Sequence, residues 1–310
     1  MKVLFCGLGS MGTRHLRNLH QIMAERQESL DCYALRSSPR TLEKSVKVLL
    51  AGELSSWDEA EEGYDIIFIT NPTALHYETL QQALLRSKKI FIEKPVFLSG
   101  QEDVANLGLT PEHICYVAAP LRYTRLVRYL KDYLSGKKVC SVRAICSSYL
   151  PDWRPGTDWK KCYSAHQDMG GGVDIDLIHE WDYLTYLFGF PQKVHSIHGR
   201  YSDVTVDSCD NAVYIGAYSQ MSVSLHLDYF GRVSRRELEI FTSEDVLVAD
   251  FIKGRIDFLK SGRSIDVVQE RDEMQCAELE YFLSIKDEQE NNNTIEHAMR
   301  VLRLARGIEL

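Results

Sequence analysis

A glycine-rich turn directly after the first strand is the feature that most restricts how this chain can fold. Residues 2–6 are mostly apolar, as in a buried strand, and they run without a break into Gly7-Leu8-Gly9-Ser10-Met11-Gly12. Residues 15–25 then carry apolar side chains at helical spacing. A strand, a G-x-G-x-x-G turn and a helix in this order are the context in which the hexapeptide binds a dinucleotide. Outside that context the hexapeptide would be an ordinary structural turn.

Each glycine of this turn has its own expected role. Gly7 allows the tight turn, Gly9 lets a pyrophosphate approach the backbone, and Gly12 lets the helix pack on the strand. The N–H groups at the start of the helix, including those of Ser10 and Met11, are then available to the phosphates, and the helix dipole adds positive charge. The sequence therefore predicts an N-terminal α/β domain with a nucleotide site.

The end of the second strand usually decides between the two nicotinamide cofactors. Residues 32–35 are the expected strand, and an acidic residue after it would bond the ribose 2′-hydroxyl of NAD. The chain reads Arg36-Ser37-Ser38-Pro39-Arg40 instead. Arg36, Ser37 and Arg40 suit a 2′-phosphate, which predicts NADP(H). If Arg36 only stacks on the adenine, NAD(H) would serve equally well, so NAD is the alternative.

A lysine at a strand end is the first candidate for chemistry. Residues 90–92 are apolar, and Glu93-Lys94-Pro95 follows them directly. Open α/β sheets bind their ligands outside the carboxyl ends of the strands, so Lys94 is expected in that crevice. Pro95 then fixes the exit of the chain. The alternative is a surface lysine before a loop proline.

Length, charge and cysteine content set the class of protein. With 310 residues, 45% of them hydrophobic, the chain is expected to form two domains. Its net charge of −8 argues against nucleic acid or an anionic membrane as the main partner. No apolar run approaches a membrane span, and Met1 leads straight into the first strand, so neither a span nor a signal peptide is expected. The eight cysteines form no C-x-x-C pair, which fits reduced thiols in a cytoplasmic protein.

The second half of the chain has a different pattern. Residues 193–260 read as strand after strand without a long helix, which predicts an open, mostly antiparallel sheet. Before them, residues 149–159 contain two prolines and two tryptophans and are expected to form a rigid loop. Trp153 and Arg154 of this loop suit a sugar ring and a phosphate or carboxylate. The tryptophans could equally cap the sheet.

A segment after three glycines supplies the other candidate catalytic residues. Apolar residues recur at helical spacing beyond residues 170–172, which predicts one continuous helix. Asp176, His179 and Asp182 are three apart and are therefore expected along one face of that helix. Asp176 and His179 are candidates for catalysis, the alternative being a core histidine tied to a neighbouring aspartate. We expect Glu180 and Asp182 to be structural or supporting groups.

Taken together, these motifs resemble those of the Gfo/Idh/MocA oxidoreductase family, named after glucose-fructose oxidoreductase, inositol dehydrogenase and a rhizopine-catabolism protein. The matching pieces occur in order, namely residues 7–12, Asn71-Pro72 with His76, Glu93-Lys94-Pro95 and residues 170–182. The resemblance implies a Rossmann domain (1–119), a substrate and oligomerisation domain with the open sheet (120–290), and a C-terminal helix packed back on the first domain (291–310). Relatives often cover such a sheet by forming a homodimer or a higher homo-oligomer.

The resemblance also implies roles for single residues. It adds to the cofactor-binding turn the residues Asn71, Pro72, His76, Glu93 and Lys94. It implies that Lys94 works on the substrate, and it gives as substrate-binding residues Arg122, Trp153, Arg154 and Tyr163. The family acid and histidine are usually four residues apart, whereas Asp176 and His179 are three apart. The aromatic loop is similar to loops of a branch associated with polysaccharide and nonulosonate-type sugars.

The expected activity is hydride transfer between NADP(H) or NAD(H) and a secondary alcohol of a sugar, sugar nucleotide or acidic sugar derivative. Lys94 would take or give the hydroxyl proton, and His179 would bond the oxygen with Asp176 orienting it. No metal is expected. Two alternatives within the same fold are an enzyme that retains NAD and cleaves glycosides by transient oxidation, and a non-enzymatic NAD(P)-binding sensor.

Overall fold

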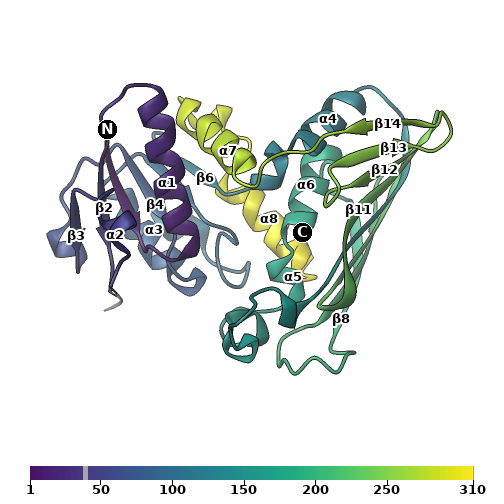
Figure 1. Cartoon of the computed structure of the whole chain (residues 1–310), viewed down its shortest axis with the longest axis horizontal. Coiled ribbons are helices and arrows are strands. Elements are labelled where there is room, and N and C mark those ends of the chain that lie inside the picture. The colour runs from purple at the N-terminus through teal and green to yellow at the C-terminus, as the bar shows by residue number, and fades with distance from the viewer. Residues whose placement is uncertain (38–40, 310) are drawn as a thin grey trace. The chain divides into compact units, whose positions relative to one another are not determined.

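The computed structural model describes residues 1–37 and 41–309 and divides the chain into two compact units, drawn in Figure 1. The first unit contains Met1–Pro120 and Asp272–Met299, and the second contains Leu121–Arg271 and the chain from Arg300 onward. Residues 272–290 therefore belong to the first unit, although the sequence predicted them in the second domain. Each unit has a sheet of its own.

A six-stranded parallel sheet forms the centre of the first unit. The elements of this unit are β1 (Lys2–Cys6), α1 (Ser10–Glu25), β2 (Asp31–Leu35), α2 (Lys44–Lys47), β3 (Gly52–Leu54), β4 (Ile66–Ile69), α3 (His76–Leu84), β5 (Lys89–Ile92), β6 (Ile114–Val117) and α7 (Glu273–Ser284). The strand order is β3-β2-β1-β4-β5-β6, which is the Rossmann order. The order reverses between β1 and β4, so their carboxyl ends are the expected ligand site. The predicted Rossmann domain is confirmed.

Helices cover both faces of this sheet, which is why its central strands are apolar throughout. The crossovers through α1 and α3 run in opposite directions along the sheet, and right-handed connections place them on opposite faces. The helix α7 shares the face of α1, since Phe282 lies 6.0 Å from the Phe68 ring and 5.3 Å from the Phe91 ring. This burial of Phe282 explains why α7 belongs to the first unit.

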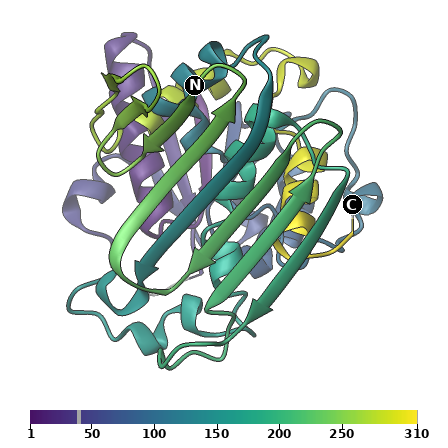
Figure 2. The same cartoon turned by 90° about the vertical axis from the view of Figure 1, so that its right-hand side faces the viewer.

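The second unit is built on an eight-stranded sheet. Its strands are β7 (Val139–Tyr149), β8 (Lys193–Gly199), β9 (Asn211–Ala217), β10 (Ser222–Asp228), β11 (Phe230–Thr242), β12 (Val246–Asp250), β13 (Arg255–Phe258) and β14 (Arg263–Asp266). The order is β14-β13-β12-β11-β7-β10-β9-β8, and Figure 2 shows the face of this sheet. Every pair is antiparallel except β7 with β10. The predicted open, mostly antiparallel sheet is confirmed.

Three helices of the second unit lie along one face of its sheet, as Figure 1 shows. They are α4 (Arg125–Tyr133), α5 (Val173–Asp176) and α6 (His179–Phe188), while α8 (Ile295–Ala305) begins in the first unit and ends in the second. Trp181 of α6 meets Tyr214 of β9 edge to face, with ring centroids 5.4 Å apart. Both rings are fully buried, so this contact anchors α6 on the sheet.

The single continuous helix predicted from the apolar spacing beyond residues 170–172 is wrong in one respect. The helix α5 ends at Asp176 and α6 begins at His179, with Leu177 at φ −98° and ψ 22° between them. The backbone tightens there, because the N–H of Ile178 bonds the carbonyl of Ile175 and the N–H of Glu180 bonds that of Leu177. Asp176 and His179 therefore flank a turn and do not share one continuous helical face.

Three further findings concern membrane-spanning helices, the cysteines and one peptide bond. Across residues 1–37 and 41–309, no helix is both long and apolar enough to cross a membrane. All eight cysteines are free thiols, and burial raises the pKa of the Cys32 thiol to about 12. The peptide bond between Lys94 and Pro95 is cis.

We expect the second unit to be sensitive to the loss of either partner of the buried Arg122–Asp182 pair. The guanidinium donates to both carboxylate oxygens, at 3.0 and 2.6 Å, and Arg122 is only 1% exposed. Asp182→Ala should lower the free energy of unfolding by about 3–5 kcal/mol, because a charge stays buried without its carboxylate. Urea unfolding measures this loss.

The matched control is Glu239→Gln, which breaks the exposed Arg143–Glu239 pair of the same unit. It should cost less than about 1 kcal/mol, as surface pairs do. Equal costs for the two variants would contradict the importance of the buried pair.

Candidate functional site

The glycine-rich turn holds the ends of β1 and β4 in backbone contact. Gly7 has φ +94°, and a Cβ built on it would lie 2.8 Å from the Cα of Asn71. A Cβ on Gly12 would lie 2.5 Å from the carbonyl oxygen of Gly7 and 2.6 Å from Oγ1 of Thr70. Neither position has space for a larger residue, so both glycines set how closely α1 packs on the sheet.

Gly9, unlike Gly7 and Gly12, faces open space that a ligand could occupy. A Cβ on Gly9 would meet nothing within 4 Å, and the residue is exposed. Gly9 is also the N-cap of α1, so no capping side chain bonds the N–H groups of the first turn, to which Ser10, Met11 and Gly12 belong. The first turn contains no acidic residue. An open backbone and free N–H groups at a helix N-terminus suit a pyrophosphate, so this turn fits a dinucleotide.

The loop after β4 is tied to the loop after β5 by His76. The His76 ring nitrogens lie 3.0 Å from the carbonyl oxygen of Asn71 and 3.1 Å from that of Pro95. Burial lowers the pKa of His76, although the surrounding carbonyls oppose this. His76 is 1% exposed, so its position favours holding these loops together over touching a cofactor, whereas Pro72 is exposed. The side-chain oxygen of Asn71 is buried and has no partner among the described residues.

Lys94 follows β5 and is only partly exposed, and its neighbour Glu93 anchors it on α1. A ring nitrogen of His15 (Nε2) lies 2.5 Å from Oε1 of Glu93, while Oε2 accepts the backbone N–H of Lys94 at 3.1 Å. Burial alone would raise the pKa of Glu93, but the hydrogen bond and charge of His15, together with Lys94, hold it below its ordinary value. The carboxylate is therefore ionised and His15 donates to it. His15 lies one helical turn after Gly12 and was not predicted from the sequence.

An acidic residue lies beside the expected cofactor-selecting arginine. The Arg36 guanidinium donates to Glu53 of β3 at 2.6 Å, and Lys47 lies 3.8 Å from the same carboxylate. Ser37 is exposed, and Arg40 lies outside the described residues. The prediction of NADP(H) counted Arg36 as available to a phosphate, whereas its charge is compensated by Glu53. Glu53 was missed because it enters the site from the neighbouring strand.

Two tyrosines hold Asp176 in the second unit. The Tyr229 hydroxyl donates to Oδ2 of Asp176 at 2.6 Å. Burial, and then the charge and hydrogen bond of Asp176, raise the pKa of both Tyr229 and Tyr163 well above their ordinary value. Both phenols therefore stay protonated and serve as donors to the carboxylate. No sequence pattern selected Tyr229, whereas Tyr163 was among the expected substrate-binding residues.

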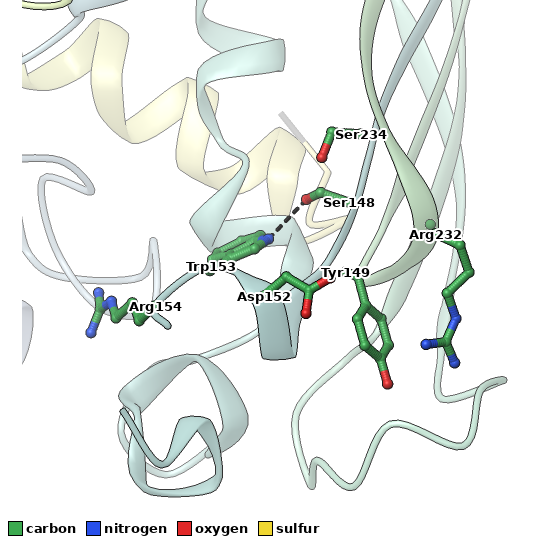
Figure 3. Close-up of a pocket in the computed structure, with 8 residues that line it drawn as sticks. Ser148, Tyr149, Asp152, Trp153, Arg154, Arg232 and Ser234 are labelled. Atoms are coloured by element: carbon green, nitrogen blue, oxygen red, sulfur yellow. Dashed lines mark hydrogen bonds between the residues drawn. The ribbon is translucent and has the colours of Figure 1, made fainter. Parts of the chain in front are cut away.

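The predicted substrate loop lies next to this acid. Trp153 packs edge to face on Tyr229, with ring centroids 5.3 Å apart, and its indole N–H donates to Ser148 at 2.9 Å. Arg154 lies 5.9 Å from the Tyr163 ring. The structure thus brings together four predicted residues, which are Asp176, Trp153, Arg154 and Tyr163. Trp153 and Arg154 also line a pocket of about 470 Å³, shown in Figure 3.

Two other predicted residues have surroundings that bear on their roles. Arg122 is buried against Asp182, and its guanidinium also lies over the Tyr186 ring, so its position favours a structural role over binding substrate. Glu180 accepts hydrogen bonds from Arg236 at 2.8 Å and from Tyr183 at 2.6 Å, as a structural group would. His179 is half-buried at the start of α6. Among the residues that the structure describes, no cluster of three or more His, Cys, Asp or Glu side chains could hold a metal ion.

The fold and the glycine-rich turn define a dinucleotide-binding domain, and comparison with known proteins names its family. Residues 1–117 match the model of the Gfo/Idh/MocA oxidoreductase family with an NAD-binding Rossmann fold. This segment is thus similar to the NAD-binding domain of the Gfo/Idh/MocA oxidoreductases, which confirms the resemblance seen in its motifs.

Curated relatives and solved structures agree with this family. The chain is 27% identical to an uncharacterized oxidoreductase of Synechocystis sp. over 50% of its own length, and it spans only 44% of that protein. It is 25% identical to the scyllo-inositol 2-dehydrogenase (NAD⁺) of Bacillus subtilis, over 89% of this chain and 83% of that protein. A levoglucosan dehydrogenase solved in complex with NADH has the same fold, with a TM-score of 0.84 at 17% identity, covering 99% of this chain and 95% of the other.

Two alanine substitutions in the turn should separate ligand binding from folding. Gly9→Ala places its methyl group in open space, so the unfolding free energy should change by less than about 1 kcal/mol. NADH binding should nevertheless be lost, because the methyl group occupies the approach of the pyrophosphate. Gly12→Ala should instead destabilise the first unit by about 1–3 kcal/mol through overpacking.

Urea unfolding and energy transfer from tryptophan to NADH measure the two effects. Unchanged NADH affinity in the Gly9→Ala variant would contradict the assignment of the turn to the cofactor.

Proposed function

We propose that this protein is a nicotinamide-dependent dehydrogenase that acts on a CH–OH group of a sugar-type substrate. The observation that carries the proposal is the placement of Lys94. It leaves the carboxyl end of β5 on the buried His15–Glu93 pair, in the same unit as the dinucleotide turn. The scyllo-inositol and levoglucosan dehydrogenases named above support a polyol or sugar substrate.

Lys94 is the group that moves the proton in this proposal. A bound nicotinamide ring supplies the acceptor or donor of hydride. During oxidation the amine of Lys94 takes the hydroxyl proton as the C–H bond breaks and the carbonyl forms, and during reduction its ammonium returns that proton. The His15–Glu93 pair fixes the backbone at Lys94, so that the amine does not have to be ordered in each turnover.

The second unit contributes groups that bind the substrate. Asp176 is held as an acceptor by the phenols of Tyr229 and Tyr163, which leaves it suited to orient a substrate hydroxyl. His179 begins the next helix and supplies a further group for hydrogen bonding. Trp153 beside Tyr229 offers an apolar ring face, a common support for sugars.

The pairing of Arg36 with Glu53 bears on cofactor choice. A 2′-phosphate would have to share Arg36 with a carboxylate 2.6 Å away, and that carboxylate repels it. NADP(H), which the sequence predicted, is therefore disfavoured by this pair, and we infer that NAD(H) binds at least as tightly. Oligomerisation through the open sheet stays a prediction, for which exposed Ile197 and Ile215 on β8 and β9 give support.

Lys94→Ala should bind NADH normally but lose turnover. Positioned proton transfer is commonly worth about 10²–10⁴-fold in rate, and that is the loss we expect in kcat. Absorbance of NADH during reaction with a panel of polyols and sugars measures it. The control is Lys88→Ala, which removes an exposed lysine just before the same strand.

Three outcomes would count against the proposed dehydrogenase mechanism or favour one of the two alternative functions. Retention of more than about a tenth of the activity in Lys94→Ala would exclude Lys94 as the acid or base. Sugar cleavage without net change of NADH would favour the NAD-retaining alternative. NADH binding without turnover on any compound would favour a sensor.

Glu53→Gln should shift the cofactor preference toward NADP(H). Removal of the carboxylate frees Arg36 for the 2′-phosphate and removes a repulsive charge, so the ratio of NADP(H) to NAD(H) affinity should rise by about tenfold or more. Glu61→Gln, which removes an exposed carboxylate elsewhere in the unit, should leave the ratio unchanged. A tighter NADP(H) complex in the unaltered protein would contradict the role of Glu53.

A further inference from the structure

A pocket in the second unit contains cationic groups that the proposed chemistry does not use. Its volume is about 470 Å³, within the range of small-molecule sites. It is lined by Ser148, Tyr149, Asp152, Trp153, Arg154, Gly231, Arg232 and Ser234, which come from the end of β7, the loop after it and the start of β11. Figure 3 shows Asp152 and Trp153 between Arg154 on one side and Tyr149 with Arg232 on the other.

Arg232 is the cation at one end of this pocket. Its guanidinium carbon lies 3.8 Å from the centre of the Tyr149 ring, so it is stacked on that ring. Within the described part of the chain it forms no ion pair and no hydrogen bond. Three residues further along β11, Arg235 is paired with Glu237 through two hydrogen bonds of 3.0 and 2.6 Å. Arg232 therefore presents a planar, oriented cation that lacks an internal counter-charge.

Apart from Asp152 and Arg154, the other residues that line the pocket are uncharged, and several of them carry hydroxyl groups. The indole of Trp153 is fixed by its hydrogen bond to Ser148, and Ser234 adds a hydroxyl beside it. Arg154 reaches away from Arg232, toward Cys162, whose sulfur lies 3.8 Å from its Nη1. Arg154 makes no ion pair in the described residues, and the two arginines that line the pocket outnumber its one carboxylate, Asp152. The pocket therefore has a net positive charge, although the whole chain carries −8.

The pocket is connected to the acid of the second unit through one ring. Trp153 packs on Tyr229, and the Tyr229 hydroxyl bonds Asp176. Trp153 and Tyr229 therefore link the pocket to Asp176, the carboxylate to which we assign the orientation of the substrate. If Asp176 binds a hydroxyl group of the substrate, another group of the same substrate would reach the end of the pocket at Arg232.

We propose that the Tyr149–Arg232 end of this pocket is a subsite for an anionic group, a phosphate or a carboxylate, carried by the sugar substrate. The stacked guanidinium offers two parallel N–H donors, the geometry that binds such groups in a bidentate manner. Asp152 and the two serines bind hydroxyl groups between this anion and the Trp153 ring. This inference rests on the proposed function for the identity of the sugar, but not for the presence of the subsite.

Binding measurements test the subsite without requiring turnover. The probes are D-glucose, D-glucuronate and D-glucose 1-phosphate, titrated into the protein by calorimetry in the absence of cofactor. The two charged sugars should bind about tenfold or more tightly than glucose, and Arg232→Ala should abolish that difference. Preference for the phosphate or for the carboxylate then identifies the natural anion.

Arg235→Ala is the matched control, because it removes an equal charge from the same strand but one that is already paired. It should keep the preference for charged sugars. Equal affinity for the three probes, no saturable binding of either charged sugar, or equal losses in the two variants would overturn the proposal. Lys94→Ala should retain the preference while losing turnover, so that failure of the dehydrogenase proposal and failure of the subsite give different results.

Discussion

The backbone contact between the ends of β1 and β4 sets the geometry of the first unit. Gly7 and Gly12 allow it, because a side chain on either would overlap Asn71, Thr70 or the turn itself. The contact fixes the start of α1, and one helical turn later α1 delivers His15 to Glu93. Glu93 in turn bonds the backbone of Lys94. A constraint that serves phosphate binding thus also determines where the candidate proton-transfer group lies.

The arginines of the second unit fall into two groups. Arg122 and Arg236 each form an ion pair with a buried carboxylate of α6, Asp182 and Glu180 respectively, so their charges are compensated within the fold. Removing either partner is costly, whereas forming the pair adds little net stability. Arg154 and Arg232, which line the pocket, have no such carboxylate partner within residues 1–37 and 41–309. This contrast separates the arginines that hold the fold from those available to a substrate, and sequence position alone does not make that separation.

Local pattern was enough to predict most of the architecture. The glycine-rich turn, the apolar strand before Glu93 and the run of strands after residue 193 each depend on neighbouring residues. The strands β3 and β14 were missed because three or four residues are too few to show a period. The break between α5 and α6 was missed because the apolar spacing continues across it.

The residues missed in the site share one property, which is contact with a distant part of the chain. His15 is 78 residues from Glu93, Glu53 is 17 residues from Arg36, and Tyr229 is 53 residues from Asp176. No periodicity within one segment can indicate such pairs. The burial of His76 and Arg122, for which ligand roles were predicted, could not be read from the sequence for a related reason, since it also depends on distant parts of the chain.

The central claim is that one unit places a nicotinamide ring beside Lys94. A crystal structure of the protein grown with NADH tests this most directly. We predict density for the pyrophosphate over Gly9 at the start of α1, and for the nicotinamide ring at the carboxyl ends of β4 and β5, next to Lys94. An empty glycine-rich turn, or a nicotinamide ring directed away from Lys94, would contradict the account.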